Sequence, residues 1–202
     1  MKCVLGDLPI SAEHLARKVI GELRPLAKTE VGNTEWTGVV KTTFATLASK
    51  YHCQPLYASK EPKRSEFMLD FVWWNESEER AILGLESEWG NPWDYKSPKN
   101  HGNVIEAIVE DFWKLLVFKA PLKVLVHTTV NAQMRHDLDH RLRSEISRYS
   151  QHLAGECYLL LEFSVAGECC CYKFVAEANG RVQNPAFEPL DNESVMALKA
   201  KA

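Results

Sequence analysis

The chain has 202 residues, of which 46% are hydrophobic and 25% are charged, and its formal net charge at pH 7 is −3. This composition is typical of one globular domain, or of one domain with short additions. The slight negative charge argues against a protein that coats nucleic acid non-specifically, although it allows a local basic groove beside an acidic metal site. No apolar run approaches the roughly 20 residues that span a membrane, and residues 1–18 lack the apolar core of a signal peptide. We therefore expect a cytoplasmic protein with no membrane partner.

Six cysteines are present, three of them consecutive at 169–171, and none belongs to a C-x-x-C pair. The consecutive cysteines lie in a strand-like segment, where neighbouring side chains face opposite ways and do not converge on one ion. A structural zinc site is therefore disfavoured, and we expect buried free thiols.

Two helices are predicted before the first strand. Ser11 is a suitable N-cap for a short amphipathic helix over 11–24, and apolar residues at helical spacing predict a second helix over 34–51. A short strand is expected at 54–59. Two longer strand-like runs then extend from 66 to 89 on either side of a polar connector.

The second half of the chain begins with a polar loop over 90–102, which is long enough to suggest a functional role. The elements expected after it are, in chain order, a helix over 103–119 capped by Asn103, a buried strand over 122–128, a polar helix over 133–152, and a hairpin of strands over 157–165 and 170–177. About fifteen residues at the end are expected to be loosely held. This order predicts an α/β fold with a mixed central β-sheet flanked by helices on both faces.

Acidic side chains interrupt the two long strand-like runs. Asp70 is the acidic residue in the apolar part of the first run, and Glu86 and Glu88 project side by side from the second. If Trp74 pairs with Ile82 across the connector, Asp70 lies opposite Glu86. Like charges in this position destabilise a sheet, and partial burial increases the cost. A divalent cation removes the problem, and carboxylates suit Mg²⁺ or Mn²⁺.

The order α-β-β-β-α-β, with these acids in its second and third strands, resembles the PD-(D/E)xK nuclease superfamily and its restriction-endonuclease-like fold. The matching residues are Leu69-Asp70 in one strand and Leu85-Glu86-Ser87-Glu88 in the next. The resemblance covers roughly residues 35 to 177. It implies a nuclease-like core domain over 35–180, with an N-terminal helix and linker over 1–34 and a C-terminal tail over 181–202.

The chain departs from the family pattern at the third motif position, where lysine is usual and Glu88 stands here. Some type II restriction enzymes also carry an E-x-E in this strand, and in other members the lysine moves to the following helix. Lys114 is the candidate for such a displaced lysine. Glu35, near the start of the helix before the sheet, resembles the auxiliary acid of several family members.

The resemblance implies a metal-dependent endonuclease that hydrolyses DNA phosphodiester bonds. Asp70, Glu86 and the backbone carbonyl of Ser87 would hold Mg²⁺ or Mn²⁺. Glu88 or Lys114 would orient or deprotonate the attacking water, and Lys114 would also stabilise charge on the phosphate. DNA is then the expected partner and substrate. A homodimer is also expected if both strands of a duplex are cut.

Simpler interpretations remain open for each of these residues. Glu86 and Glu88 could face solvent on an edge strand, and Lys114 could form an ordinary surface pair with Glu110 one helical turn away. Glu35 could be a charge that favours a helix N-terminus. The whole chain could then be a catalytically inactive module with the nuclease fold that binds nucleic acid or a protein partner.

Two further features of the sequence have structural interpretations. His127 ends the buried strand and is expected to be a histidine at the edge of the core with its hydrogen bonds satisfied. The arginines and histidines of the helix over 133–152 are typical of a solvated helix face, although they could contact phosphate groups.

Overall fold

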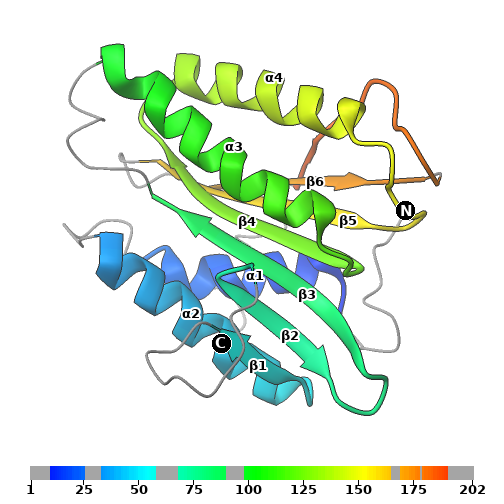
Figure 1. The fold of residues 1–202 in the computed structure, drawn as a ribbon. Coiled ribbons are helices and arrows are strands. Elements are labelled where there is room, and N and C mark those ends of the chain that lie inside the picture. Colours follow the sequence, from blue (N-terminus) through cyan, green and yellow to red (C-terminus); the bar gives the residue numbers. More distant parts are fainter. Residues whose placement is uncertain are drawn as a thin grey trace.

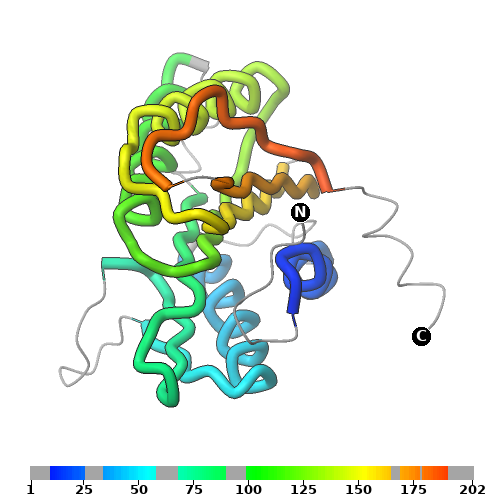
Figure 2. Tube along the Cα trace, turned by 90° about the vertical axis from the view of Figure 1, so that its right-hand side faces the viewer, coloured from blue at the N-terminus to red at the C-terminus, as the bar shows by residue number. Residues whose placement is uncertain are grey.

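The computed structural model describes residues 10–25, 33–57, 68–89, 98–164, 169–177 and 179–190. These residues form three layers, with a mixed sheet between two pairs of helices (Figure 1). The helices are α1 (Ala12–Leu23), α2 (Asn33–Lys50), α3 (His101–Val117) and α4 (Ala132–Arg148). Figure 2, turned by 90°, shows α1 on the opposite side of the molecule from α3 and α4. No helix within the described ranges is long and apolar enough to cross a membrane.

The strands lie in the sheet in chain order. They are β1 (Gln54–Tyr57), β2 (Phe71–Asn75), β3 (Arg80–Glu88), β4 (Leu122–Thr129), β5 (Cys157–Ser164), β6 (Cys169–Val175) and β7 (Glu188–Pro189). The neighbours β3, β4 and β5 are parallel, because α3 and α4 carry the chain back between them, and all other neighbouring pairs are antiparallel. The predicted α/β class with a mixed sheet flanked by helices is confirmed.

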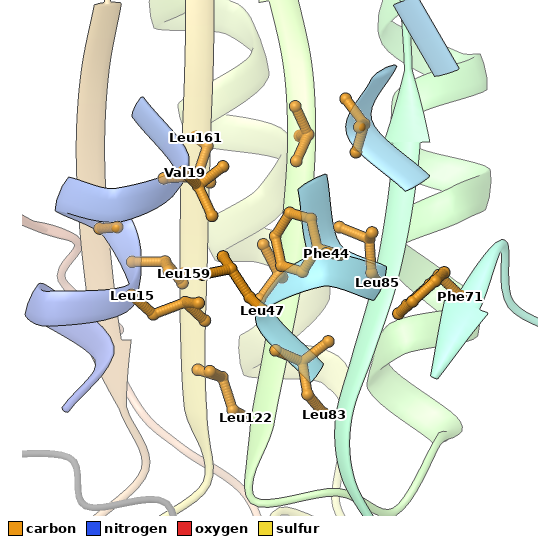
Figure 3. Close-up of a cluster of buried hydrophobic side chains, with 14 of the residues drawn as sticks. Leu15, Val19, Phe44, Leu47, Phe71, Leu83, Leu85, Leu122, Leu159 and Leu161 are labelled. Carbon is orange, nitrogen blue, oxygen red and sulfur yellow. The ribbon is translucent and has the colours of Figure 1, made fainter. Parts of the chain in front are cut away.

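Both faces of the sheet are covered by apolar side chains. Figure 3 shows the layer under α1 and α2, where Leu15 and Phe44 from the helices meet Leu85, Leu122 and Leu159 from the strands. A second apolar cluster fills the space between the sheet and the other helix pair. Because both faces of the sheet are covered, β3, β4 and β5 have apolar residues at most of their positions. Most of the polar side chains on these strands are therefore buried by the fold, whereas Arg80, Glu88 and Ser164 at strand ends are half-buried.

Several element ends differ from the prediction. β2 begins at Phe71, because residues 68–70 form a bend. The N-cap of α3 is Asn100 and not Asn103, because a 3-10 turn at Pro98–Asn100 leads directly into the helix. The N-cap Ser11 of α1 is confirmed, and its hydroxyl accepts a hydrogen bond from the backbone N–H of His14 at 3.2 Å.

The C-terminal part of the chain shows two further differences. α4 ends at Arg148 and not at 152, because Tyr149 has an extended backbone with φ −72° and ψ 131°. β7 was not predicted, and the N–H of Leu190 donates to the carbonyl of Cys171 at 2.8 Å beside it. The polar loop up to residue 97, the last twelve residues and Cys3 lie outside the described residues. The other five cysteines are free thiols; Cys53, Cys157 and Cys171 are buried as expected, whereas Cys169 and Cys170 are only half-buried.

The pairing of β2 with β3 contains a bulge that the sequence did not reveal. Trp74 pairs with Ala81 and not with Ile82, because the register shifts between Trp73 and Trp74. The predicted pairing was therefore wrong by one residue at the connector. On the other side of the bulge the pairs agree with the predicted register, and Phe71 lies opposite Leu85.

Candidate functional site

Asp70 and Glu86 come together where β2 meets β3. The pair Phe71–Leu85 is the last in the ladder; Asp70 precedes Phe71 in the bend, Glu86 follows Leu85 on β3, and the negative charge of Asp70 acts on Glu86. Leu69, which precedes Asp70 in the bend, packs over Gly84 of β3. A Cβ atom at Gly84 would lie only 2.7 Å from Leu69 Cδ1 and 2.9 Å from Phe118 Cδ1, so a larger residue here would require these two side chains to shift.

Asp70 has a partner for each of its carboxylate oxygens. The backbone N–H of Ser87 donates to Oδ2 at 3.1 Å, and the ammonium of Lys41 on α2 lies 3.0 Å from Oδ1. The side chains of Lys41 and Asp70 remain about one quarter exposed, so an ion could reach this carboxylate from solvent. Asp70 is therefore held in place by its neighbours while staying accessible.

The carboxyl group of Glu86 has fewer hydrogen-bond partners than that of Asp70. Its side chain is 2% exposed, and its buried Oε1 atom has no hydrogen-bond partner among the described residues. Burial, together with the negative charges of Asp111 and Asp70, raises the pKa of Glu86 to about 9, against the opposing effect of Lys114. In the absence of another cation, the structure therefore favours the protonated form of Glu86 at neutral pH.

Lys114 extends from α3, the helix between β3 and β4, toward the carboxylate cluster of Asp70 and Glu86. Its ammonium lies 2.6 Å from Asp111 Oδ1 and 3.6 Å from Glu86 Oε1, and the second distance is too long for a hydrogen bond. Burial alone would lower the pKa of Lys114, but the hydrogen bond to Asp111 and the charges of Glu86, Asp111 and Asp70 raise it. Lys114 therefore remains a cation beside a carboxyl group that needs one.

The immediate partner of Lys114 is Asp111, at i−3, and not the predicted Glu110, at i−4. Positions three and four residues apart both lie on one helix face. Asp111 is half-buried on the side of α3 that faces the sheet, whereas Glu110 is exposed. Asp111 thus brings a third carboxylate to the cluster.

The other two predicted site residues lie farther from these contacts. Glu88 is on the same face of β3 as Glu86, two residues along, where it pairs with His127 of β4. It is half-buried and has partners of its own. Glu35 is exposed in the first turn of α2, and it is Lys41, farther along that helix, that contacts Asp70.

The carboxylates present fit a small divalent cation. Mg²⁺ is usually held by one or two carboxylates, with water and substrate phosphate as its other ligands, and Asp70 and Glu86 supply such a pair. The unsatisfied Oε1 of Glu86 is a suitable ligand atom. Within the described ranges no group of three or more histidine, cysteine, aspartate or glutamate residues is arranged to hold a metal ion. Such an ion would therefore have to complete its shell with water or phosphate.

Sequence reasoning missed two members of the cluster, Lys41 and Asp111. Lys41 lies off the apolar stripe of α2, a position that normally indicates a solvated charge, and only the packing of α2 beside β2 brings it to Asp70. Asp111 had a detectable signal, since it lies one helical turn before Lys114.

No family model matches the chain, and neither the curated proteins nor the solved structures contain a significant match to it. The resemblance to the PD-(D/E)xK superfamily therefore stays a prediction.

Proposed function

We propose that the chain is a metal-dependent endonuclease that hydrolyses DNA phosphodiester bonds. The observation that carries the proposal is the position of the Lys114 ammonium, 3.6 Å from the buried Oε1 atom of Glu86. A cation from the helix between β3 and β4 here adjoins Glu86 of β3, and the negative charge of Asp70, in the bend before β2, also acts on it. Carboxylates that bind a metal, beside a lysine that contacts the phosphate, are the groups that phosphodiester hydrolysis requires.

Asp70 and Glu86 are the proposed ligands of Mg²⁺ or Mn²⁺, and the backbone carbonyl of Ser87 is a third candidate. Once bound, the ion would lower the pKa of a water molecule and neutralise charge on the phosphate. The hydrogen bond from the Ser87 N–H engages Oδ2 of Asp70, so a bound ion would have to displace Lys41 from Oδ1. Glu86 must lose its proton before it can bind the ion.

Lys114 has the properties of a group that stabilises charge and not those of a general base. Its pKa is raised, so it stays protonated at neutral pH and cannot accept a proton from water. Its side chain is 42% exposed, which leaves the ammonium accessible to a phosphate group. Glu88, on the same face of β3, is the remaining carboxylate that could orient the attacking water.

A catalytically inactive module that binds nucleic acid or a protein is the second candidate. The observation that favours it is that two lysines already accompany the acids, Lys41 with Asp70 and Lys114 with Asp111. In that case the cluster is an ion-pair network whose charges largely neutralise one another. The two candidates differ in whether the cluster binds a divalent cation.

Calorimetric titration with Mn²⁺ separates them. At about pH 7 the nuclease proposal predicts binding of Mn²⁺ with release of about one proton, measured by repeating the titration in buffers of different ionisation enthalpy. Glu86→Gln should abolish the proton release and weaken binding, and Asp70→Asn should weaken binding. Glu110→Gln, an exposed residue of α3, is the matched control and should behave like the wild type. Absence of Mn²⁺ binding by the wild type, or binding unchanged in both site variants, would contradict the proposal.

A further inference from the structure

A second group of polar side chains lies on the same face of the sheet as Glu86. The strand register aligns Glu88 of β3 with His127 of β4, and His127 with Glu162 of β5. His127 is 3% exposed and Glu162 is 1% exposed, so both are buried although both are polar. Buried polar groups of this kind normally have a structural or a binding role.

His127 and Glu162 line a pocket of about 310 Å³ between α4 and the strands β4, β5 and β6. The charged and basic residues of its wall are His127, Arg135, His136, Asp139, Arg143 and Glu162. Its volume is at the lower end of the range for small-molecule sites, and its mixture of apolar and polar groups is typical of them. The pocket is therefore large enough for one planar ring system with part of a sugar.

The charges of the pocket are balanced. Arg135 Nε donates to both carboxylate oxygens of Glu162, at 2.8 and 3.0 Å, and Arg143 Nε donates to Asp139 Oδ2 at 2.7 Å. Each arginine is thus paired with a carboxylate in the same wall. An isolated phosphate would meet both signs of charge here, so the pocket suits a ligand that is polar but uncharged.

Guanidinium donors in the wall remain available for such a ligand. Arg135 bonds Glu162 through Nε, and the described residues leave its two terminal amino groups without a hydrogen bond. The Nδ1 atom of His127 is buried and has no partner of good geometry within the described ranges. Burial lowers the pKa of His127, so its neutral ring forms part of the wall behind the pocket surface.

The remaining wall is apolar and can cover the faces of a ring. Leu138 and Leu142 of α4 line it, together with Phe187, and the guanidinium of Arg143 lies 5.6 Å from the centroid of the Phe187 ring. Aromatic and guanidinium groups stack on nucleic-acid bases in many protein complexes. A planar heteroaromatic ring therefore fits both the polar and the apolar parts of the pocket.

We propose that this pocket binds a guanine base of the DNA strand that the Asp70–Glu86 cluster would cut. Guanine presents the acceptors O6 and N7, which match the terminal amino groups of Arg135. It also presents N–H donors, which match the carboxylates of the pocket wall, Asp139 and Glu162. The identity of the ligand as part of a DNA strand rests on the proposed nuclease function. Glu162 lies two strands across the sheet from Glu86 and two residues further along its strand. At ordinary strand spacings the separation is roughly 12 Å. This is the axial length of about three or four stacked nucleotides.

The test uses guanosine, which carries the base without a phosphate, and follows binding by NMR and calorimetry in metal-free buffer. The wild type should bind guanosine at least about tenfold more tightly than cytidine or ribose 5-phosphate. Ala132→Trp should abolish binding by closing the pocket, since Ala132 lines the pocket at an exposed position at the start of α4. Gln133→Trp places the same side chain on an adjacent exposed residue outside the pocket wall and should leave binding intact. Thermal melting should show that both variants fold.

Three results would overturn the assignment: no guanosine binding at millimolar concentration, binding unaffected by Ala132→Trp, or ribose 5-phosphate binding as tightly as guanosine. Asp70→Asn keeps the pocket intact and should bind guanosine normally, so the pocket is tested independently of the metal site. Conversely, metal-dependent cleavage by a protein that does not bind guanosine would leave the nuclease proposal standing and remove only the pocket.

Discussion

The backbone N–H of Ser87 donates a hydrogen bond of 3.1 Å to Oδ2 of Asp70, which lies 17 residues earlier in the chain. This bond fixes Asp70 against β3, and Lys41 occupies its other oxygen. Asp70 is therefore satisfied, while its neighbour Glu86 has a buried oxygen without a hydrogen bond within the described residues. The unfavourable electrostatic energy of the cluster is thus concentrated at Glu86.

Glu86→Gln should stabilise the protein at alkaline pH. The folded pKa of Glu86 is raised from 4.5 to about 9, so the folded protein keeps a proton that the unfolded chain releases between these values. The stabilisation from this proton is complete below about pH 4.5 and is lost as pH rises toward 9. Urea unfolding over that range should show wild-type stability falling relative to the variant, by on the order of a few kcal/mol. Equal pH slopes for the two proteins would contradict this, and Glu110→Gln is the control.

Lys114→Ala should lower the rate of DNA cleavage by at least about a hundredfold while leaving Mn²⁺ binding largely intact. The reason is that Lys114 stabilises charge on the phosphate without binding the ion. Single-turnover cleavage and calorimetry on the same preparation separate the two effects. If Lys114 were only a surface partner of Asp111, its removal would cost about 0.2–0.5 kcal/mol of stability and leave cleavage unchanged.

Lys41→Ala should tighten the binding of Mn²⁺. Lys41 places a positive charge 3.0 Å from the Asp70 oxygen that an ion would use, so the lysine and the ion compete for it. The ion pair is partly exposed, and its loss should cost no more than about 1 kcal/mol of folding stability. Titration of the variant beside Lys50→Ala, an exposed lysine at the end of α2, measures the effect. Weaker Mn²⁺ binding in Lys41→Ala would show that Lys41 supports the site and does not compete for it.

The sequence predicted the order of the elements from Ser11 to the β6 strand because their apolar patterns are long and regular. It also placed Asp70 and Glu86 beside the last pair of the β2–β3 ladder, although the pairing it assumed at the connector was wrong. The bulge at Trp73 and Trp74 absorbs the extra residue before the ladder reaches Asp70, and no local pattern in the sequence indicates it.

The contacts of the site depend on packing between helices and sheet, which periodicity does not determine. Lys41 has the position of a surface charge on α2, yet the packing of that helix brings it to Asp70. His127 was predicted to be a satisfied histidine, but its Nδ1 atom has no partner of good geometry among the described residues. In both cases the pattern gives the helix face or strand end, and the neighbouring element decides the contact.

A buried network away from the candidate site provides a separate test of the fold. The ammonium of Lys123 is fully buried and lies 3.1 Å from Glu156 Oε2 and 3.0 Å from the hydroxyl of Tyr158. Glu156→Gln should cost about 3–5 kcal/mol, because it leaves the Lys123 charge uncompensated in the core. The double variant Lys123→Met/Glu156→Gln should recover part of that loss. Chemical denaturation measures both, and a loss below about 1 kcal/mol in Glu156→Gln would contradict the network.

The most direct test of the central claim is cleavage of DNA by the purified protein in Mg²⁺, in Mn²⁺ and in EDTA. We expect the wild type to cleave only with a divalent ion. Asp70→Asn and Glu86→Gln should each lower the rate by at least about a hundredfold, and Glu110→Gln should cleave like the wild type. Absence of cleavage of single-stranded, double-stranded and supercoiled DNA by the wild type with either ion, or full activity in both site variants, would contradict the account.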